Sequence, residues 1–362
     1  MTWFVTRFDF RAPGADPAAR RELYARAVEQ AAYADAHGQD VLSLPEHHGA
    51  DDGYLPSPLV VAAAMAAVTR RVSIGVMALQ VNLHDPLRLA EDVAVLDHVS
   101  GGRVTYTLGL GYRREEYDMF GRAWDTRGAD LGDRIALLQR AWSGEPVTVG
   151  GRTVRVTPVP FTRPHPILFH GGASAAAARR AARLGLHFQP QVADPDLAEL
   201  YRAECRAHGR EPGMVLPPPA GPIVVFCAED PDRFWALYGE YLLIDARLQD
   251  AWHGDAGLPS AIRDSSTTVE AMRAAGRYVV LTPDELADRI RAREIRAVTG
   301  HPLCAGLPAE PSWESLRLIG DVAERTRCRN PAPEPAPEPA SEPAPAPEPG
   351  GEPGTDPRSV TA

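Results

Sequence analysis

The sequence of 362 residues predicts an α/β protein whose fold class is a (β/α)8 TIM barrel, with insertions at the barrel mouth and a disordered C-terminal tail. Eight short β-rich segments alternate with helical patterns, which is typical of parallel strands joined by crossover helices. A doubly wound sheet is the rival arrangement, but no G-x-G-x-x-G motif follows the first predicted strand. The hydrophobic content of 44% is enough for a sizeable core.

The predicted strands and helices follow one another along the whole body of the chain. The strands lie at residues 3–8, 40–44, 72–79, 103–108, 166–170, 186–190, 221–227 and 295–299. Helical patterns lie at about residues 18–37, 57–69, 86–98, 130–142, 174–184, 194–208, 230–252 and 312–326. Segment 72–79 is small or apolar almost throughout, as expected for a parallel strand covered on both faces. Segment 86–98 begins with proline and carries one apolar stripe, as expected for a helix.

Two segments interrupt this alternation. Residues 143–165 are predicted to form a hairpin or a loop excursion, and residues 253–294 a Gly/Pro/Ser-rich loop followed by helical material. Long insertions between a strand and a helix form the mouth of a barrel, so either segment is a candidate lid.

The domain boundary is predicted near Asn330. Residues 1–329 form the predicted barrel, and residues 330–362 are rich in Pro, Glu and Ala. Such a segment has too little apolar surface to offset its ordering entropy, so we expect a disordered tail without a catalytic role.

Charge and composition exclude several classes of protein. The net charge is −10, but residues 331–362 carry six acids and one arginine, so the body carries only −5. A mildly acidic body argues against a nucleic-acid-binding surface. All 38 basic residues are arginines, which excludes a Schiff-base lysine, pyridoxal-phosphate chemistry and the lysine of a P-loop.

The cysteines and the N-terminus predict a cytoplasmic protein. The four cysteines show none of the short paired spacings of metal sites and are expected to be free thiols in a reducing compartment. The N-terminus lacks the basic and apolar regions of a secretory leader. No segment approaches the ~20 apolar residues of a membrane span, so we expect no membrane contact.

Glu46, His47 and His48 directly follow the predicted strand 40–44. In a parallel barrel this position is the C-terminal rim, where active sites lie. Histidine exchanges protons near neutral pH, so His47 is a candidate for proton transfer. The competing interpretation is a pair of loop histidines that make ordinary hydrogen bonds.

Two glycine-containing turns follow other strands. His170-Gly171-Gly172-Ala173-Ser174 connects a strand to a helix, and the backbone amides at a helix start suit a phosphate group. Gly109-Leu110-Gly111-Tyr112 leaves room for a flat ring or a phosphate at the end of strand 103–108. The competing interpretation of both segments is an ordinary tight turn.

A metal site is the chemical alternative at the same rim. His47, His48, His84 and His170 could reach one barrel mouth. However, the sequence contains no H-x-H and no H-E-x-x-H motif, so the residue spacing disfavours a metal.

Five stretches together resemble the bacterial luciferase-like monooxygenase family: LPEHHG (44–49), HDPLRLAEDVAVLDHVSGGRV (84–104), GLGYRREEYDMFG (109–121), HGGASAAAARRAARLG (170–185) and WESLRL (313–318). The resemblance covers about residues 3–326. It implies a (β/α)8 barrel that binds reduced FMN, supplied by a separate flavin reductase, and that forms a homodimer. It also implies a monooxygenase that uses O2 to oxygenate a small organic substrate.

The resemblance also implies roles for individual residues. His47 matches the catalytic histidine after the second strand. Met77 and Ala78 stand where the family has a non-proline cis peptide under the flavin ring. Gly172, Ala173 and Ser174 match the turn that binds the phosphate of the cofactor.

The chain departs from the family at three cofactor positions. Leu110 stands where bacterial luciferase has a phosphate-binding arginine, and Ala173 replaces an acid that contacts the phosphate. Phosphate binding would then depend on Ser174, backbone amides and Arg113. Tyr112, which with Gly111 is a candidate cofactor contact, stands where deazaflavin-dependent relatives have a glutamate; this favours FMN over F420.

Three other functions stay open at this point. An F420-dependent enzyme on the same fold would transfer hydride without O2. A non-catalytic flavin-binding protein would bind flavin without turnover, and a metal-dependent barrel hydrolase would hold zinc or manganese. The sequence does not identify the substrate.

Overall fold

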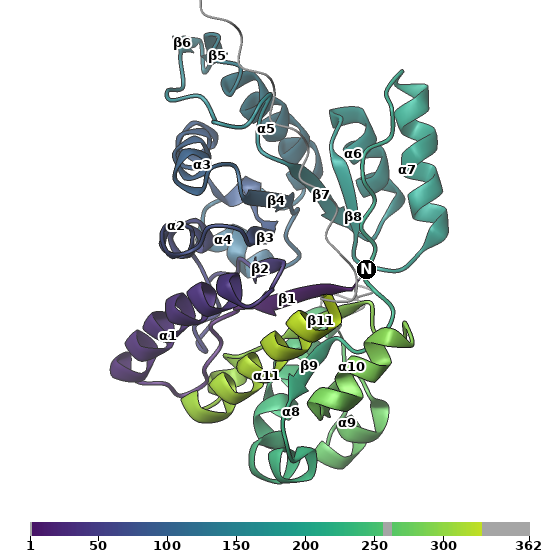
Figure 1. Ribbon diagram of the computed structural model, residues 1–362. Coiled ribbons are helices and arrows are strands. Elements are labelled where there is room, and N and C mark those ends of the chain that lie inside the picture. Colours follow the sequence, from purple (N-terminus) through teal and green to yellow (C-terminus); the bar gives the residue numbers. More distant parts are fainter. Residues whose placement is uncertain (1, 256–262, 328–362) are drawn as a thin grey trace, which may run out of the picture.

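Seven parallel strands form the main sheet of the protein (Figure 1). The computed structural model describes residues 2–255 and 263–327, so the predicted tail lies outside the described residues. The strand order is β11-β1-β2-β3-β4-β7-β8, and each neighbouring pair is parallel. The bounds are β1 Trp3–Arg7, β2 Val41–Leu44, β3 Ser73–Leu79, β4 Val104–Leu108, β7 Leu168–Gly172, β8 His187–Pro190 and β11 Ala297–Gly300. All seven overlap predicted strands.

A separate parallel pair is formed by β9 (Val224–Cys227) and β10 (Tyr278–Leu281). Strand β9 was predicted and lies against β11, whereas β10 was not predicted. In the described part of the chain no strand ladder joins this pair to the main sheet. The structure therefore confirms an α/β fold with a curled parallel sheet, but not a closed eight-stranded barrel.

Helices cover the outer side of the strands (Figure 1). They are α1 Pro17–Ala36, α2 Pro58–Val68, α3 Pro86–Ser100, α4 Arg114–Met119, α5 Arg127–Ala141, α6 Ala175–Leu184, α7 Pro195–Ala207, α8 Pro231–Asp255, α9 Val269–Ala275, α10 Pro283–Arg291 and α11 Ala309–Arg327, with short 3₁₀ turns at Val81–Leu83 and Cys304–Gly306. None of the helices in residues 2–255 and 263–327 is long and apolar enough to cross a membrane. The short helices α4 and α9 were not predicted.

Local sequence explains where the helices begin and end. Asp85 caps α3 by accepting hydrogen bonds from the backbone N–H groups of Leu87 and Arg88, and Pro86 occupies the first turn. The helix ends at Gly101, whose φ of 64° is left-handed. Its apolar stripe packs in the main core, where the Trp142 indole N–H of the segment after α5 donates to the carbonyl of Ala90 at 3.0 Å.

Residues 143–165 contain the predicted hairpin. Strands β5 (Val147–Val149) and β6 (Arg152–Val154) pair antiparallel around Gly150 and Gly151, both at positive φ. The hairpin projects beyond α5, at the end of the molecule opposite α8 and α9 (Figure 1).

Candidate active site

The carboxyl ends of several strands open into one cavity of about 1110 Å³. This volume slightly exceeds the ~300–1,000 Å³ of usual ligand pockets, so there is room for a cofactor and a second small molecule. All eight predicted site residues line it: His47, Met77, Ala78, Gly111, Tyr112, Gly172, Ala173 and Ser174. Their individual roles remain predictions.

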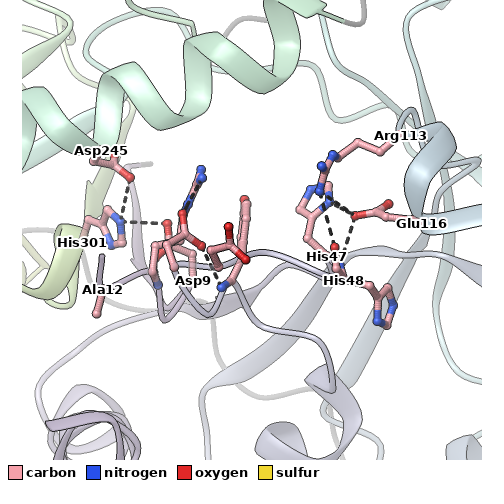
Figure 2. A network of polar contacts seen from close by, with 12 residues as sticks. Asp9, Ala12, His47, His48, Arg113, Glu116, Asp245 and His301 are labelled. Carbon is pink, nitrogen blue, oxygen red and sulfur yellow. Dashed lines mark hydrogen bonds and ion pairs between the residues drawn. The ribbon is translucent and has the colours of Figure 1, made fainter. Parts of the chain in front are cut away.

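His47 forms a buried pair with Glu116 of α4 (Figure 2). The His47 Nδ1 atom lies 2.9 Å from the Glu116 carboxylate, which also accepts a hydrogen bond from the His48 backbone N–H at 3.0 Å. Gln80 donates to the other carboxylate oxygen at 2.9 Å. Burial would raise the pKa of Glu116, but these hydrogen bonds outweigh it and lower the pKa.

This pairing fixes the tautomer of His47. An ionised carboxylate can only accept hydrogen bonds, so Nδ1 carries the proton and Nε2 of the neutral ring has a free lone pair. The Tyr112 hydroxyl lies 3.3 Å from Nε2 and can donate to it. Burial raises the pKa of Tyr112, so the hydroxyl keeps its proton at neutral pH. Nε2 of His47 is therefore the atom that can exchange protons at this wall of the cavity.

Replacing Tyr112 with phenylalanine tests this hydrogen bond. We expect a loss of about 2- to 13-fold in kcat, since one neutral hydrogen bond contributes about 0.5–1.5 kcal/mol. Steady-state kinetics with the Tyr54→Phe variant as a neighbouring control measures the effect. An unchanged kcat in Tyr112→Phe would show that this hydroxyl does not assist His47.

Glu46 is the centre of a second buried cluster. Its carboxylate lies 3.1 Å from Nε2 of His48 and 2.7 Å from Nε2 of His84, and it accepts the backbone N–H of Gln80. Burial would raise the pKa of Glu46, but the hydrogen bonds from His48, His84 and Gln80 lower it to about 2. For His84 burial lowers the pKa, but Glu46 outweighs it and raises the pKa. Glu46 is therefore ionised and holds the loop after β2 against the loop after β3.

A third network is centred on the buried His301 (Figure 2). His301 lies between two buried carboxylates, 3.1 Å from Asp9 and 3.6 Å from Asp245. Burial opposes the charged ring, but the two carboxylates outweigh burial and raise the pKa of His301 to about 9. Asp9 also pairs with Arg7 at 2.9 Å, and Arg7 lines the cavity. The two carboxylates and the two cations, His301 and Arg7, therefore form a charge-balanced network that extends from the cavity wall into the core.

Within the described residues, one group has the spacing of metal ligands: Asp245, His301 and Cys304. Its protonation states oppose metal binding, because His301 is cationic at neutral pH and burial raises the pKa of the Cys304 thiol. The four rim histidines named above have other partners. His48 and His84 share Glu46, His47 contacts Glu116, and His170 contacts Arg180. Among the described residues, none of these four histidines belongs to a group with the spacing of metal ligands.

The predicted phosphate turn has the local structure that the sequence indicated. Ser174 caps α6 by accepting the Ala177 backbone N–H at 3.3 Å. Gly172 has a φ of 152°, and a Cβ atom there would lie 2.7 Å from the Ala177 Cβ. Gly172 therefore has no room for a side chain, and the turn lines the cavity. The Met77–Ala78 peptide bond is cis, as predicted.

Two expectations about the surroundings of the site were wrong, and a third is supported by a single described residue. No residue of 143–165 lines the cavity, and of the described part of 253–294 only Arg277 does. One wall is instead formed by the proline-rich segment 216–223 (LPPPAGPI), of which residues 221–223 were predicted as the start of a strand and the rest were assigned to no element. Arg113 does not line the cavity; its guanidinium lies 3.8 Å from the Trp252 ring centre and 3.9 Å from Glu116.

Sequence reasoning also missed four residues that the tertiary structure brings to the site: Gln80, Glu116, Arg127 and Arg180. Glu116 stands within the quoted stretch RREEYDM, but the neighbouring Glu115 carries the same charge. The Glu115 side chain is 75% exposed and that of Glu116 is fully buried. No local signal separates the two.

Comparisons with known proteins identify the family of the chain. The family model described as luciferase-like monooxygenase matches residues 3–300. The alkanal monooxygenase alpha chain of Photorhabdus luminescens is 27% identical over 180 residues, 46% of this chain and 47% of that protein. The alignments span about half the length of the curated relatives that the chain matches.

Solved structures of the same fold cover nearly the whole chain. The monooxygenase RslO1 from Streptomyces bottropensis is 25% identical with a TM-score of 0.70, over 88% of this chain and 98% of that one. The oxygenating constituent of 3,6-diketocamphane monooxygenase from Pseudomonas putida, in complex with FMN, is 20% identical with a TM-score of 0.67, over 90% and 98%. An F420-dependent secondary alcohol dehydrogenase is 16% identical with a TM-score of 0.61, over 90% and 99%.

The family match extends from β1 to the end of β11 and includes every predicted site residue. The chain belongs to the luciferase-like monooxygenase family.

Proposed function

We propose that this protein is a flavin-dependent monooxygenase that uses reduced FMN and O2 to oxygenate a small organic substrate. The observation that carries the proposal is that one cavity is lined both by His47, which pairs with Glu116 behind it, and by the Gly172–Ser174 turn. A group for proton transfer and a turn suited to phosphate thus face the same space. Family membership supports the same activity.

The residues of the cavity fit FMN. Gly172, Ala173 and Ser174 would hold the phosphate with backbone N–H groups and the start of α6. Met77, Ala78, Gly111 and Tyr112 would contact the ring. At Gly109 a Cβ atom would lie 2.8 Å from the Ala78 Cβ, so glycine lets β4 approach β3 closely beside the proposed ring site. Bound reduced flavin would supply the two electrons that O2 needs to oxygenate a substrate.

The protein groups that would act in the reaction are His47 and its neighbours. Nε2 of His47 would take up and return protons, because Glu116 keeps the proton of the neutral ring on Nδ1. Tyr112 would hold Nε2 towards the cavity. The apolar side chains of segment 216–223 would keep water from the reacting atoms.

The partners belong to the same proposal. A separate flavin reductase would supply reduced FMN. A homodimer would cover Val60 of α2 and Val95 and Val99 of α3, which are 49–71% exposed on two helices that pack together. Strand β9, which lies beside β11, would be the eighth strand of the predicted cylinder.

Hydride transfer with F420 is the second candidate, because an F420-dependent dehydrogenase shares this fold. Nothing in the cavity requires O2, and Tyr112 in place of a glutamate is the residue that favours FMN. A flavin-binding protein without turnover would bind FMN and oxidise no substrate. A metal-dependent hydrolase would contain stoichiometric zinc or manganese by elemental analysis.

Anaerobic titration of the purified protein with reduced FMN and with reduced F420 tests the proposal. We expect reduced FMN to bind at least about tenfold more tightly, a difference of about 1.4 kcal/mol. Isotopically labelled O2 with reduced FMN and a panel of ketones, aldehydes and phenols should then place one labelled atom in a product. Tighter binding of F420, or labelled product from none of the substrates, would contradict the proposal.

A further inference from the structure

The cavity has a second end, away from the Gly172–Ser174 turn. Four residues of three strands line it: Val5, Arg7, Ser43 and Thr299. In the main sheet β2, β3 and β4 separate β1 from β7, which carries the turn. A flavin held between β7 and β3 would therefore leave this end to the second small molecule. The end adjoins His47, because β1 pairs with β2 and His47 follows β2.

Arg7 is the charged residue at this end. It lies opposite Ser43 in the β1–β2 ladder, and its side chain is 14% exposed. Its Nη2 group donates to the Asp9 carboxylate at 2.9 Å, and the guanidinium makes no other hydrogen bond to the described residues. A guanidinium has five N–H donors. Arg7 therefore has donors to spare for a molecule in the cavity.

His301 holds Arg7 at two points (Figure 2). Its Nδ1–H donates to the backbone carbonyl of Arg7 at 3.2 Å. Its Nε2 atom lies 3.1 Å from Asp9, the carboxylate that binds the Arg7 guanidinium. Asp245 lies 3.6 Å from the same nitrogen and accepts the Tyr278 hydroxyl at 2.6 Å. Both ring nitrogens thus face oxygen acceptors, as a cationic ring requires, and the ring fixes the main chain and the side chain of Arg7 together.

The charges around Arg7 favour a neutral ligand. The two carboxylates of the network are balanced by His301 and Arg7. A carboxylate ligand would add an unbalanced charge beside this buried network, which is costly. A neutral oxygen can accept a hydrogen bond from the guanidinium without changing the balance. The rest of the molecule would lie against Val5 and the proline-rich segment 216–223, which are apolar.

We infer that Arg7 binds the carbonyl oxygen of a neutral, apolar substrate, with His301 as the positioning residue of Arg7. The inference rests on the proposed function, which leaves this end of the cavity to the substrate, and it adds the class of substrate. A carbonyl oxygen has no proton and only accepts hydrogen bonds, so it matches a group that only donates them.

Calorimetric titration of the full chain with oxidised FMN present tests the inference. The probes are 2-tetralone, tetralin and tetralin-2-carboxylate, which share a frame but differ in the oxygen group. We expect 2-tetralone to bind at least about tenfold more tightly than the other two. Arg7→Met should weaken 2-tetralone about 10- to 100-fold, as expected for one hydrogen bond to a charged group, and leave tetralin unchanged. Arg11→Met is the matched control, because it removes a buried arginine that pairs with Asp52 at 2.7 Å but does not line the cavity.

Two further measurements keep the test decisive if Arg7→Met unfolds. Arg7→Lys keeps the charge beside Asp9 and should bind 2-tetralone with an affinity between those of the other two proteins. The ¹³C resonance of the labelled carbonyl should move downfield when 2-tetralone binds the unsubstituted chain. His301→Gln should reduce this shift, because the ring no longer fixes the guanidinium.

The outcomes separate this inference from the proposed function. With FMN bound, equal affinities for the three probes, binding of none of them or tighter binding of the carboxylate would overturn the role of Arg7 alone. So would an unshifted carbonyl resonance, or equal effects of Arg7→Met and Arg11→Met. Failure of the chain to bind FMN would overturn the proposed function and this inference together.

Discussion

The His47→Ala variant is expected to lose about 10²- to 10⁴-fold of the oxygenation rate, the usual contribution of a positioned acid–base group. FMN should bind the variant as it binds the unsubstituted chain, because the proposed phosphate contacts lie on other elements. The reason for the loss is that alanine removes Nε2, the one atom of the pair with Glu116 that is free to exchange protons. Single-turnover rates with reduced FMN and O2, beside FMN titrations, measure the two effects separately.

His208→Ala is the control for this prediction, because His208 is exposed on the surface at the end of α7. Glu116→Gln refines the test: an amide can accept from Nδ1 or donate to it, so it does not fix the tautomer. We expect Glu116→Gln to slow the reaction less than His47→Ala. If His47→Ala oxygenates at the unsubstituted rate, or loses FMN binding to the same extent as turnover, His47 is not the proton-transfer group.

The Glu46→Gln variant is expected to be less stable than the unsubstituted chain by about 3 kcal/mol at pH 7. The estimate follows from the pKa of Glu46, which folding lowers from 4.5 to about 2, at 1.36 kcal/mol per pH unit. Because folding lowers this pKa, the contribution is complete above about pH 4.5 and is lost as pH falls towards 2. The stability gap between the two proteins should therefore shrink between pH 5 and pH 3. Urea unfolding at a series of pH values measures the gap.

Glu115→Gln provides the control, since the Glu115 side chain is 75% exposed and should change stability by less than about 0.5 kcal/mol. Other carboxylates also titrate in this range, but they contribute equally to both proteins and cancel in the difference. A gap that does not depend on pH would mean that the charge of Glu46 is not what stabilises the loops after β2 and β3.

The strands and most helices could be read from local sequence. Segment 72–79 is apolar because β3 is covered on both faces, and Asp85, Pro86 and Gly101 mark the ends of α3 through their own backbone preferences. Strand β10 was not predicted, because its four residues, YVVL, lie between two short helices in a segment interpreted as an insertion. A run so short carries too little periodicity to separate strand from helix.

The candidate site likewise contains residues that the sequence predicted and residues that only the folded chain brings there. By itself the sequence determined which residues lie at strand ends: His47 after β2, Gly111 and Tyr112 after β4, and the turn from Gly172 to Ser174 at the end of β7. Chain order and parallel pairing bring these ends to one side, so all eight predicted residues line one cavity.

Only the tertiary structure decided which partners those residues have. It buries Glu116 on His47 and leaves Glu115 in solvent, although the two are adjacent and identical in type. It sets Arg180 against His170, and it makes segment 216–223 rather than the hairpin a wall of the cavity. Backbone preferences act over a few residues and can be read along the chain. Burial and charge pairing depend on segments distant in sequence, which meet only when the chain has folded.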